Sequence, residues 1–253
     1  MRSLMLAAIA AMLAVQDKTA GSTDPDAVMK EFKQAYTKAG KSDSDRVAAT
    51  RMLGQAPHAK TLGALSQLLL GAGGGQEVQE VRIAAAETIG EFFGKIANAW
   101  SPLASCARIR DRKITEIRVA SVKAMGRLAQ PPSLRALQDL VDDKPFDMAK
   151  EAVDALARIP DRSSVPLLIK LLREVERVPD SAILPELPFH GLGAGGVVVD
   201  DARNEQITRR KTLYNPTLDT LKALTGQDFT SYKEYQKWWS ANGSSFQVSG
   251  GRK

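Results

Sequence analysis

Few side chains in this sequence have the types and spacing that acid-base, metal or nucleophilic chemistry requires. The chain has two histidines, His58 and His190, and one cysteine, Cys106. None of them lies in a C-x-x-C or H-E-x-x-H pattern, the spacings that bring zinc ligands together. A single cysteine also has no partner for an intrachain disulfide. The sequence therefore predicts no metal site, no cofactor and no catalytic residue, and we interpret Cys106 as a buried, inert thiol.

One segment matches the glycine pattern of dinucleotide-binding loops. Gly191–Gly196 reads G-x-G-x-x-G, a pattern that holds a pyrophosphate when a strand precedes it and a helix N-terminus follows it. Here the proline-containing segment Pro185–Pro188 precedes it and Val197–Val199 follows. We therefore interpret residues 178–204 as a long Gly- and Pro-rich inserted loop. Val197–Val199 has a second interpretation, as an extended segment that contacts a partner.

The composition is that of a basic globular protein. Of its 253 residues, 43% are hydrophobic and 25% are charged, and the formal net charge is +6. Basic side chains cluster at Arg108–Lys113 and Arg209–Lys211, but Asp111 interrupts the first cluster and no aromatic residues are interleaved with either. This pattern favours loose attraction to acidic partners and not nucleic-acid binding.

The N-terminus has the pattern of a secretory signal peptide. Arg2 is followed by an uncharged apolar run from Leu4 to Val15, which is shorter than the ~20 residues needed to span a bilayer. We expect residues 1–16 to be cleaved and the protein to be exported to the periplasm or the extracellular space, with no stable membrane span afterwards. The alternative is an N-terminal amphipathic or anchoring helix.

A repeat organises the middle of the chain. Arg46–Gly54, Arg82–Gly90 and Arg118–Gly126 align, each 36 residues after the last, and Ala149–Ala157 is a degenerate fourth copy. Apolar and small residues in each copy follow the 3.6-residue period of a helix with a wide buried stripe. Other helices are expected between the copies, each with a proline near its start. They begin near residues 57, 101, 132 and 163. Each repeat is therefore predicted to be a helix pair.

These copies resemble the V-R-x-A-A-x-x-x-L-G signature of the HEAT-repeat family, in its shorter bacterial form. The resemblance covers residues 44–177 and, more weakly, 205–242. It implies an all-α fold, a right-handed α-solenoid of stacked helix pairs, with residues 24–40 as an N-terminal capping helix. The function that we expect is that of a monomeric, non-catalytic scaffold for a protein partner. The alternatives are a HEAT-like enzyme or enzyme subunit of the lyase or glycosylase type, and a structural envelope component.

Stacking of equivalent positions would create a first column of charges, formed by Arg46, Arg82 and Arg118. The resemblance implies that the arginine at this position braces the start of its helix through nearby acids, and ligand binding is the alternative. The acids that precede the three copies are Asp43, Asp45, Glu77, Glu80 and Glu116.

A second column alternates in sign and consists of Arg51, Glu87, Lys123 and Asp154. Neighbouring members could form ion pairs, each worth ~0.3 to 1 kcal/mol if exposed. If the second helices line a concave face, as the resemblance implies, the same column would contact a partner. We keep both interpretations, a solvated ladder and a partner-binding surface.

The C-terminal segment is rich in aromatic residues. A helix from about Arg203 is expected to break at Asn215–Pro216, and Gly226 ends the helix that follows. TGQDFTSYKEYQKWW then resembles the closing segment of exported bacterial HEAT-repeat proteins, and Ser231 with Glu234 fits a capping box. We predict a lid over the last helix pair, followed by a flexible tail at 243–253, with a ligand platform as the alternative. The lid residues are Phe229, Tyr232, Tyr235, Trp238 and Trp239.

Overall fold

The computed structural model describes residues 24–71, 77–177 and 201–248. Every regular element within these residues is a helix, which confirms the predicted all-α class. The predicted signal peptide (1–16) lies outside the described residues, as do 178–200 of the predicted loop and 249–253 of the tail. No helix in the described part of the chain has the length and apolar character needed to cross a membrane. The chain divides into two compact units, Met1–Ile96 and Ala97–Lys253.

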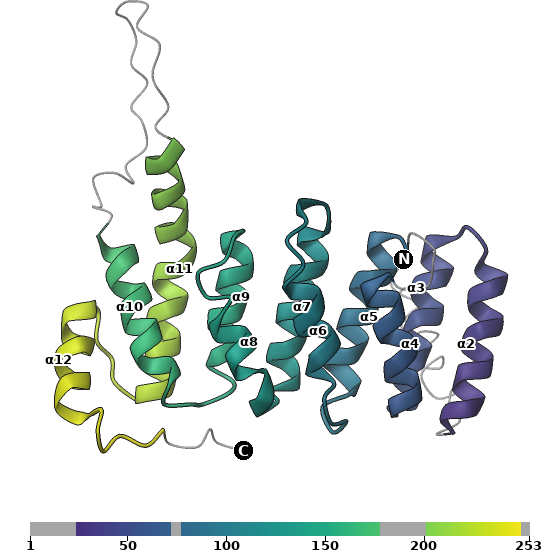
Figure 1. Ribbon diagram of the computed structural model, residues 1–253, viewed down its shortest axis with the longest axis horizontal. Coiled ribbons are helices and arrows are strands. Elements are labelled where there is room, and N and C mark those ends of the chain that lie inside the picture. Colours follow the sequence, from purple (N-terminus) through teal and green to yellow (C-terminus); the bar gives the residue numbers. More distant parts are fainter. Residues whose placement is uncertain (1–23, 72–76, 178–200, 249–253) are drawn as a thin grey trace, which may run out of the picture. The chain divides into compact units, whose positions relative to one another are not determined.

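Within the described residues of unit 1, Met1–Ile96, the helices form two pairs, whose members are labelled in Figure 1. In the first pair α2 (Pro25–Ala39) packs against α3 (Asp43–Met52), and in the second α4 (Ala59–Leu70) packs against α5 (Gln79–Phe92). The second helices α3 and α5 also pack against each other. The core of the unit is aliphatic with one aromatic ring, and its members include Val28, Phe32, Leu53, Leu65, Leu69, Val81 and Ile89. The predicted capping helix at 24–40 is thus the first helix of the first pair.

Local capping explains where these helices begin and end. The Asp24 side chain accepts a hydrogen bond from the Asp26 amide at 3.1 Å, and Gly40 ends α2 with a positive φ of 56°. His58 Nδ1 accepts from the Lys60 amide at 3.2 Å, within a capping box completed by Thr61. One of the two histidines therefore serves a helix start.

Unit 2, Ala97–Lys253, continues the alternation of first and second helices. Its second helices are α7 (Thr115–Leu128), α9 (Phe146–Leu156) and α11 (Asp201–Thr225), and each packs against the next. Their first helices are α6 (Trp100–Ala107), α8 (Leu134–Gln138) and α10 (Ser164–Glu176). In the core of this unit Cys106 is completely buried, as predicted.

The glycine of the repeat signature has a packing role where α7 meets α9. A Cβ added at Gly126 would lie 2.8 Å from the Ala155 Cβ, closer than two carbon atoms can approach without movement. The absence of a side chain at Gly126 therefore allows these two second helices to pack closely.

Helix α11 corrects two expectations. It begins at Asp201, so residues 201–204 are helical and not part of the loop, and it continues through Pro216 to Thr225 without the expected break. Pro216 cannot donate a backbone hydrogen bond, but the side chains on either side of it, Leu213 and Leu221, are both completely buried. The parts of α11 before and after Pro216 both pack against the rest of unit 2. This packing offsets the lost hydrogen bond and keeps the helix continuous.

The C-terminal helix α12 (Tyr232–Asn242) packs against α10 (Figure 1). The expected capping box is present, with Ser231 and Glu234 bonding each other's backbone amides. Tyr235 is completely buried and donates to the Gln227 carbonyl at 2.9 Å. The helix start is also tied to α10, because the Tyr232 amide donates to Glu176 Oε1 at 2.7 Å.

The remaining predicted lid residues lie around this buried tyrosine. Phe229 packs edge-on against Tyr235, with ring centroids 5.1 Å apart. Trp238 and Trp239 are half-buried, and Phe246 packs edge-on against both rings. Tyr235 is thus the residue that α12 inserts into the core, whereas the tryptophans form a cluster with the segment that follows the helix.

Candidate partner-binding grooves

The first predicted column, Arg46, Arg82 and Arg118, lies near the N-terminal ends of second helices, where Arg118 is buried and the other two are half-buried. Arg118 in α7 is only 5% exposed at its side chain, and its NH2 group donates to Asp143 Oδ2 at 3.0 Å. Its Nε donates to the Ala107 carbonyl at 2.9 Å, at the end of α6, and its NH1 donates to the Lys144 carbonyl. One guanidinium therefore ties the preceding first helix and the turn before α9 to α7.

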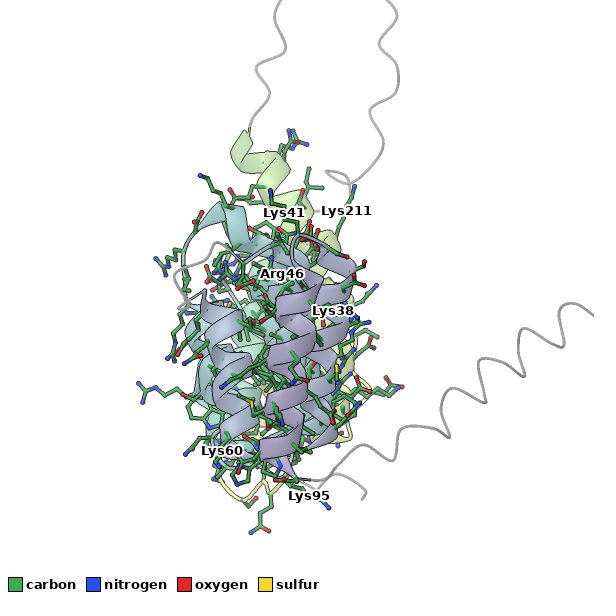
Figure 2. The ribbon with its side chains drawn as sticks, turned by 90° about the vertical axis from the view of Figure 1, so that its right-hand side faces the viewer. Lys38, Lys41, Arg46, Lys60, Lys95 and Lys211 are labelled. Atoms are coloured by element: carbon green, nitrogen blue, oxygen red, sulfur yellow. The ribbon has the colours of Figure 1, made fainter. Side chains whose placement is uncertain are left out.

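Unit 1 has a related arrangement around Arg46. Its NH2 group lies 2.5 Å from Glu77 Oε2. The same oxygen accepts a hydrogen bond from the Tyr36 hydroxyl at 2.5 Å. The guanidinium lies over the Tyr36 ring, 4.9 Å from its centroid. Burial, followed by the neighbouring Glu77, raises the pKa of Tyr36 to about 12. Arg46 lies toward the end of α2 at which that helix stops, whereas Lys60 lies near its start (Figure 2).

These contacts support the bracing interpretation but correct its partners. The acids bound by Arg46 and Arg118 precede the next second helix along the chain, not their own. Arg82 binds the end of its own first helix, with Nε 2.8 Å from the Leu69 carbonyl. The partners differ from the expected ones because the second helices stack. A long arginine side chain near the start of one second helix reaches the turn that precedes the next second helix.

In the second predicted column Arg51 and Lys123 are exposed, and Glu87 and Asp154 are half-buried. Arg51 and Glu87 lie 3.3 Å apart, with side chains 61% and 42% exposed, so α3 and α5 form one step of the predicted ladder. In unit 2, Asp154 pairs with Lys150 in its own helix at 2.9 Å, and this hydrogen bond raises the pKa of Lys150. Lys123 is exposed on α7. The structure thus forms the ladder in unit 1 and a within-helix pair in unit 2.

The second column borders a groove between α3 and α5 in unit 1. Its volume is about 630 Å³, and Arg51 and Glu87 line it. Its floor is apolar, formed by Val47 and Ile83, both half-buried, and by buried Ala84. Two members of the predicted partner-binding column therefore lie beside accessible apolar surface.

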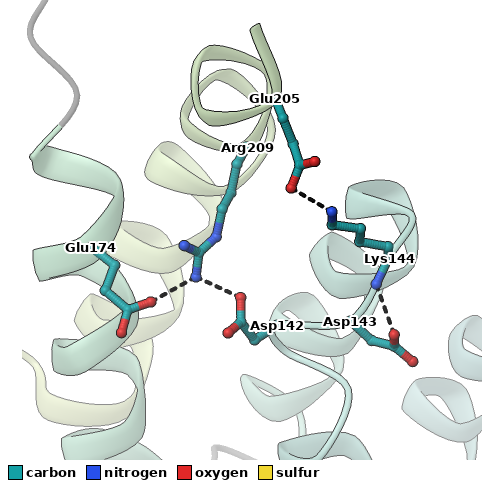
Figure 3. A network of polar contacts seen from close by, with 6 residues as sticks. All are labelled: Asp142, Asp143, Lys144, Glu174, Glu205 and Arg209. Carbon is teal, nitrogen blue, oxygen red and sulfur yellow. Dashed lines mark hydrogen bonds and ion pairs between the residues drawn. The ribbon is translucent and has the colours of Figure 1, made fainter. Parts of the chain in front are cut away.

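A second groove, of about 760 Å³, lies within unit 2 beside the turn that leads into α9. Lys144 Nζ pairs with Glu205 at 2.5 Å, and the Arg209 guanidinium bridges Asp142 at 2.5 Å and Glu174 at 2.7 Å (Figure 3). These ion pairs connect α11 with the turn and with α10. Of these residues, Asp142, Lys144 and Glu205 line the groove, together with Arg118, Asp143 and Asp147.

The second groove gathers carboxylates but shows no arrangement suited to metal chemistry. Asp142, Asp143 and Glu205 each pair with a basic side chain, which neutralises them within the fold. Across the described residues, no three His, Cys, Asp or Glu side chains are grouped so that they could hold a metal ion. The arrangement suits a structural network that shapes a polar groove.

Sequence reasoning did not identify this second groove. Its residues come from the segment before α9, from α7 and from α11, and their separation in sequence hides their proximity. The available signal was the charged run Asp142–Lys144 directly before Pro145. A charged turn directly before a predicted second helix indicates that side chains of the neighbouring helices form ion pairs there.

Comparison with known protein families finds a match in unit 2. The family described as PBS lyase HEAT-like repeat matches residues 149–174, which lie in α9, the following turn and α10. This match falls on the copy that sequence reasoning called degenerate, and it supports the predicted resemblance to HEAT-like repeats. A search of curated proteins finds no matching relative.

Proposed function

Because the chain contains a HEAT-like repeat within stacked helix pairs, we propose that it is a non-catalytic scaffold that binds a protein partner along the exposed face of its second helices. The observation that carries this proposal is the groove between α3 and α5. Its rim includes the exposed Arg51–Glu87 pair and its floor is apolar. Partner-binding surfaces combine a polar rim with apolar area in this way.

The repeat architecture suits binding through many modest contacts. Within a unit, neighbouring second helices present equivalent positions side by side, as α3 and α5 do with Arg51 and Glu87, so a partner can contact several helices through a repeated set of positions. Exposed pairs such as Arg51–Glu87 contribute little to folding. Their charges can therefore be rearranged by a partner at small energetic cost.

A capture experiment tests the scaffold role. The full chain, carrying a cross-linker, is used as bait in envelope fractions and compared with a variant in which the second column is reversed in charge. The substitutions are Arg51→Glu, Glu87→Lys, Lys123→Glu and Asp154→Lys. A control variant, Glu31→Lys with Lys33→Glu, exchanges two exposed charges on α2 and, like the reversed column, keeps the net charge.

We expect one partner to be captured by the wild-type chain and by the α2 control but not by the column variant. Equal capture by all three chains would remove the second column as the binding surface. Circular dichroism of each variant checks that the helical fold is retained.

Export is part of the same proposal and rests on residues 1–16. We expect N-terminal sequencing of the protein recovered from envelope or culture fractions to begin after Ala14–Gln16. Recovery of the chain in the cytoplasm, with Met1 or Arg2 at its N-terminus, would contradict export.

An enzymatic role is the second candidate, and the carboxylates of the unit 2 groove favour it. Asp142, Asp143 and Glu205 each pair with a basic side chain, however, so these ion pairs already engage the carboxylates that a proton-transfer step would use. A structural envelope role, in contrast, requires self-association. We expect light scattering after size-exclusion chromatography to give the mass of a monomer, and a stable higher mass would favour the structural role.

A further inference from the structure

The groove between α3 and α5 has a charge that indicates what it binds. We propose that this groove accepts a basic peptide segment that carries an apolar side chain between its positive charges. The proposal rests on the scaffold function and names the chemistry of the partner at one site. It applies to unit 1 alone.

The walls of the groove are mainly acidic. Asp43, Glu80 and Glu87 line it, and the basic lining residue, Arg51, is paired with Glu87. Asp43 and Glu80 are exposed in the first turns of α3 and α5. Negative charge there also favours the helix starts, but a cation placed between the two carboxylates would gain attraction from both. The free groove therefore has an excess of negative charge at one end.

The floor supplies the apolar part of the site. Val47 and Ile83 occupy equivalent repeat positions, 36 residues apart, and both are half-buried in the groove. An apolar side chain of the peptide would cover their exposed surface and remove it from water, which favours binding. Charge alone would attract many cations, whereas this apolar contact selects a peptide side chain between the charges.

The pairing of an acid with an aliphatic residue on α5 recurs on α7 in unit 2, so it follows the repeat and is not particular to one helix. Glu116 in α7 lies 36 residues after Glu80, and Val119 lies 36 residues after Ile83. Glu116 is exposed and Val119 is half-buried, as are their counterparts in α5. An acid one turn before a half-buried aliphatic residue is thus shared by α5 and α7.

This local charge is opposite to that of the whole chain, whose formal net charge is +6. A basic peptide is therefore attracted by the groove and not by the protein as a whole. Since exposed charges are screened by salt, binding should weaken as the ionic strength rises.

The test uses the full chain and fluorescein-labelled peptides, with binding followed by anisotropy. The first peptide alternates lysine with leucine, the second has glutamate in place of lysine, and the third has serine in place of leucine. The chains are wild type, Glu80→Lys in the groove, and Glu31→Lys on α2, an exposed acid outside the groove. Thermal unfolding of each chain confirms that it is folded.

We expect only the lysine-leucine peptide to bind the wild-type chain. Glu80→Lys should weaken that binding about tenfold, while Glu31→Lys should change it by less than about twofold. Equal weakening by the two substitutions would overturn the proposal, as would equal binding of the glutamate or serine peptide.

The outcome can be separated from that of the scaffold proposal. If the column-reversed variant loses partner capture while Glu80→Lys retains full peptide binding, the groove proposal is wrong and the scaffold proposal stands. If Glu80→Lys loses peptide binding while the reversed column still captures its partner, the groove is supported and the second column is removed as the partner surface.

Discussion

Two sets of charges recur with the repeat, and they have opposite environments. Arg118 is 5% exposed at its side chain and binds two backbone carbonyls and a carboxylate. Arg51 is 61% exposed and has one carboxylate partner, Glu87. Both lie on second helices, in the first turns for Arg118 and in the last turn for Arg51. The same residue type therefore holds the stack together at one position and faces solvent at the other.

This difference in exposure distinguishes charges that stabilise the fold from charges that are available to a partner. A guanidinium whose donors are used within the fold fixes the elements that it contacts, as Arg118 does for the end of α6 and the turn before α9. An exposed ion pair adds little stability and can change partners. We therefore assign the Arg46, Arg82 and Arg118 column to the fold, and the Arg51, Glu87, Lys123 and Asp154 column to the proposed interface.

The largest effect should come from Arg118→Leu. This change removes the donor to Asp143 Oδ2 and to two carbonyl groups, and we expect the free energy of unfolding to fall by about 3 to 5 kcal/mol. Urea denaturation measures the loss. Arg127→Leu, an exposed arginine on the same helix, should stay within about 0.5 kcal/mol. Similar losses for both would mean that Arg118 does not brace the stack.

The contrast between inward and outward side chains extends to α12, the predicted lid helix. Tyr235→Ala removes a completely buried ring and should cost about 3 kcal/mol. Tyr235→Phe loses only the hydrogen bond to the Gln227 carbonyl and should cost about 1 kcal/mol. Thermal unfolding of the two variants checks the ratio. A wild-type melting temperature for Tyr235→Ala would show that α12 is not a lid.

The Arg46 site predicts a pH dependence. The pKa of Tyr36 is raised from 10.0 to about 12 by burial and by Glu77, so above pH 10 the unfolded chain releases a proton that the folded chain keeps. Stability from this group is complete below pH 10 and is lost as the pH rises toward 12. The difference in unfolding free energy between wild type and Tyr36→Phe should therefore shrink over that range. A constant difference would contradict the raised pKa.

The smallest effect should come from the exposed pair. A double-mutant cycle with Arg51→Ala and Glu87→Ala should give a coupling energy of about 0.2 to 1 kcal/mol, measured by urea denaturation. The coupling should decrease at high salt. A coupling above about 2 kcal/mol would place this pair with the bracing column and weaken its assignment to the interface.

Much of the fold could be predicted because its signals are local. Asp24, Ser231 and Glu234 cap helices through neighbouring amides, and the repeat fixes which helices are equivalent. The prediction of a helix break at Pro216 was wrong. The packing of Leu213 and Leu221 outweighs the tendency of proline to interrupt a helix. Packing of this kind depends on residues that are distant in sequence.

The candidate sites were only partly predictable for the same reason. Arg51 and Glu87 were found through the repeat spacing, since equivalent positions on stacked helices lie side by side. The acid bound by Arg118 was assigned to the wrong turn, because the sequence does not show how far a turn reaches over its neighbour. The unit 2 groove was missed because Lys144 and Glu205 meet only after α11 packs against α9.

The fourth repeat copy shows how a short signature can mislead. Ala149 and Ala157 replace the arginine and glycine of the other copies, and these two changes made the copy look degenerate. The family match at 149–174 extends through the next helix. A comparison over a whole helix pair therefore finds a repeat even where the arginine and glycine of the nine-residue signature have been replaced.

The contact between Gly126 and Ala155 has a consequence for how the sequence can diverge. A Cβ at position 126 would lie 2.8 Å from the Cβ of Ala155 and 3.2 Å from its Cα. Glycine at 155 would remove the first of these contacts but not the second, so a larger residue at 126 also requires α7 and α9 to move apart. We therefore expect glycine to be retained at position 126 wherever the two helices pack this closely. The exposed positions of the same helices carry no such restriction, and their charges can change independently while the stack is kept.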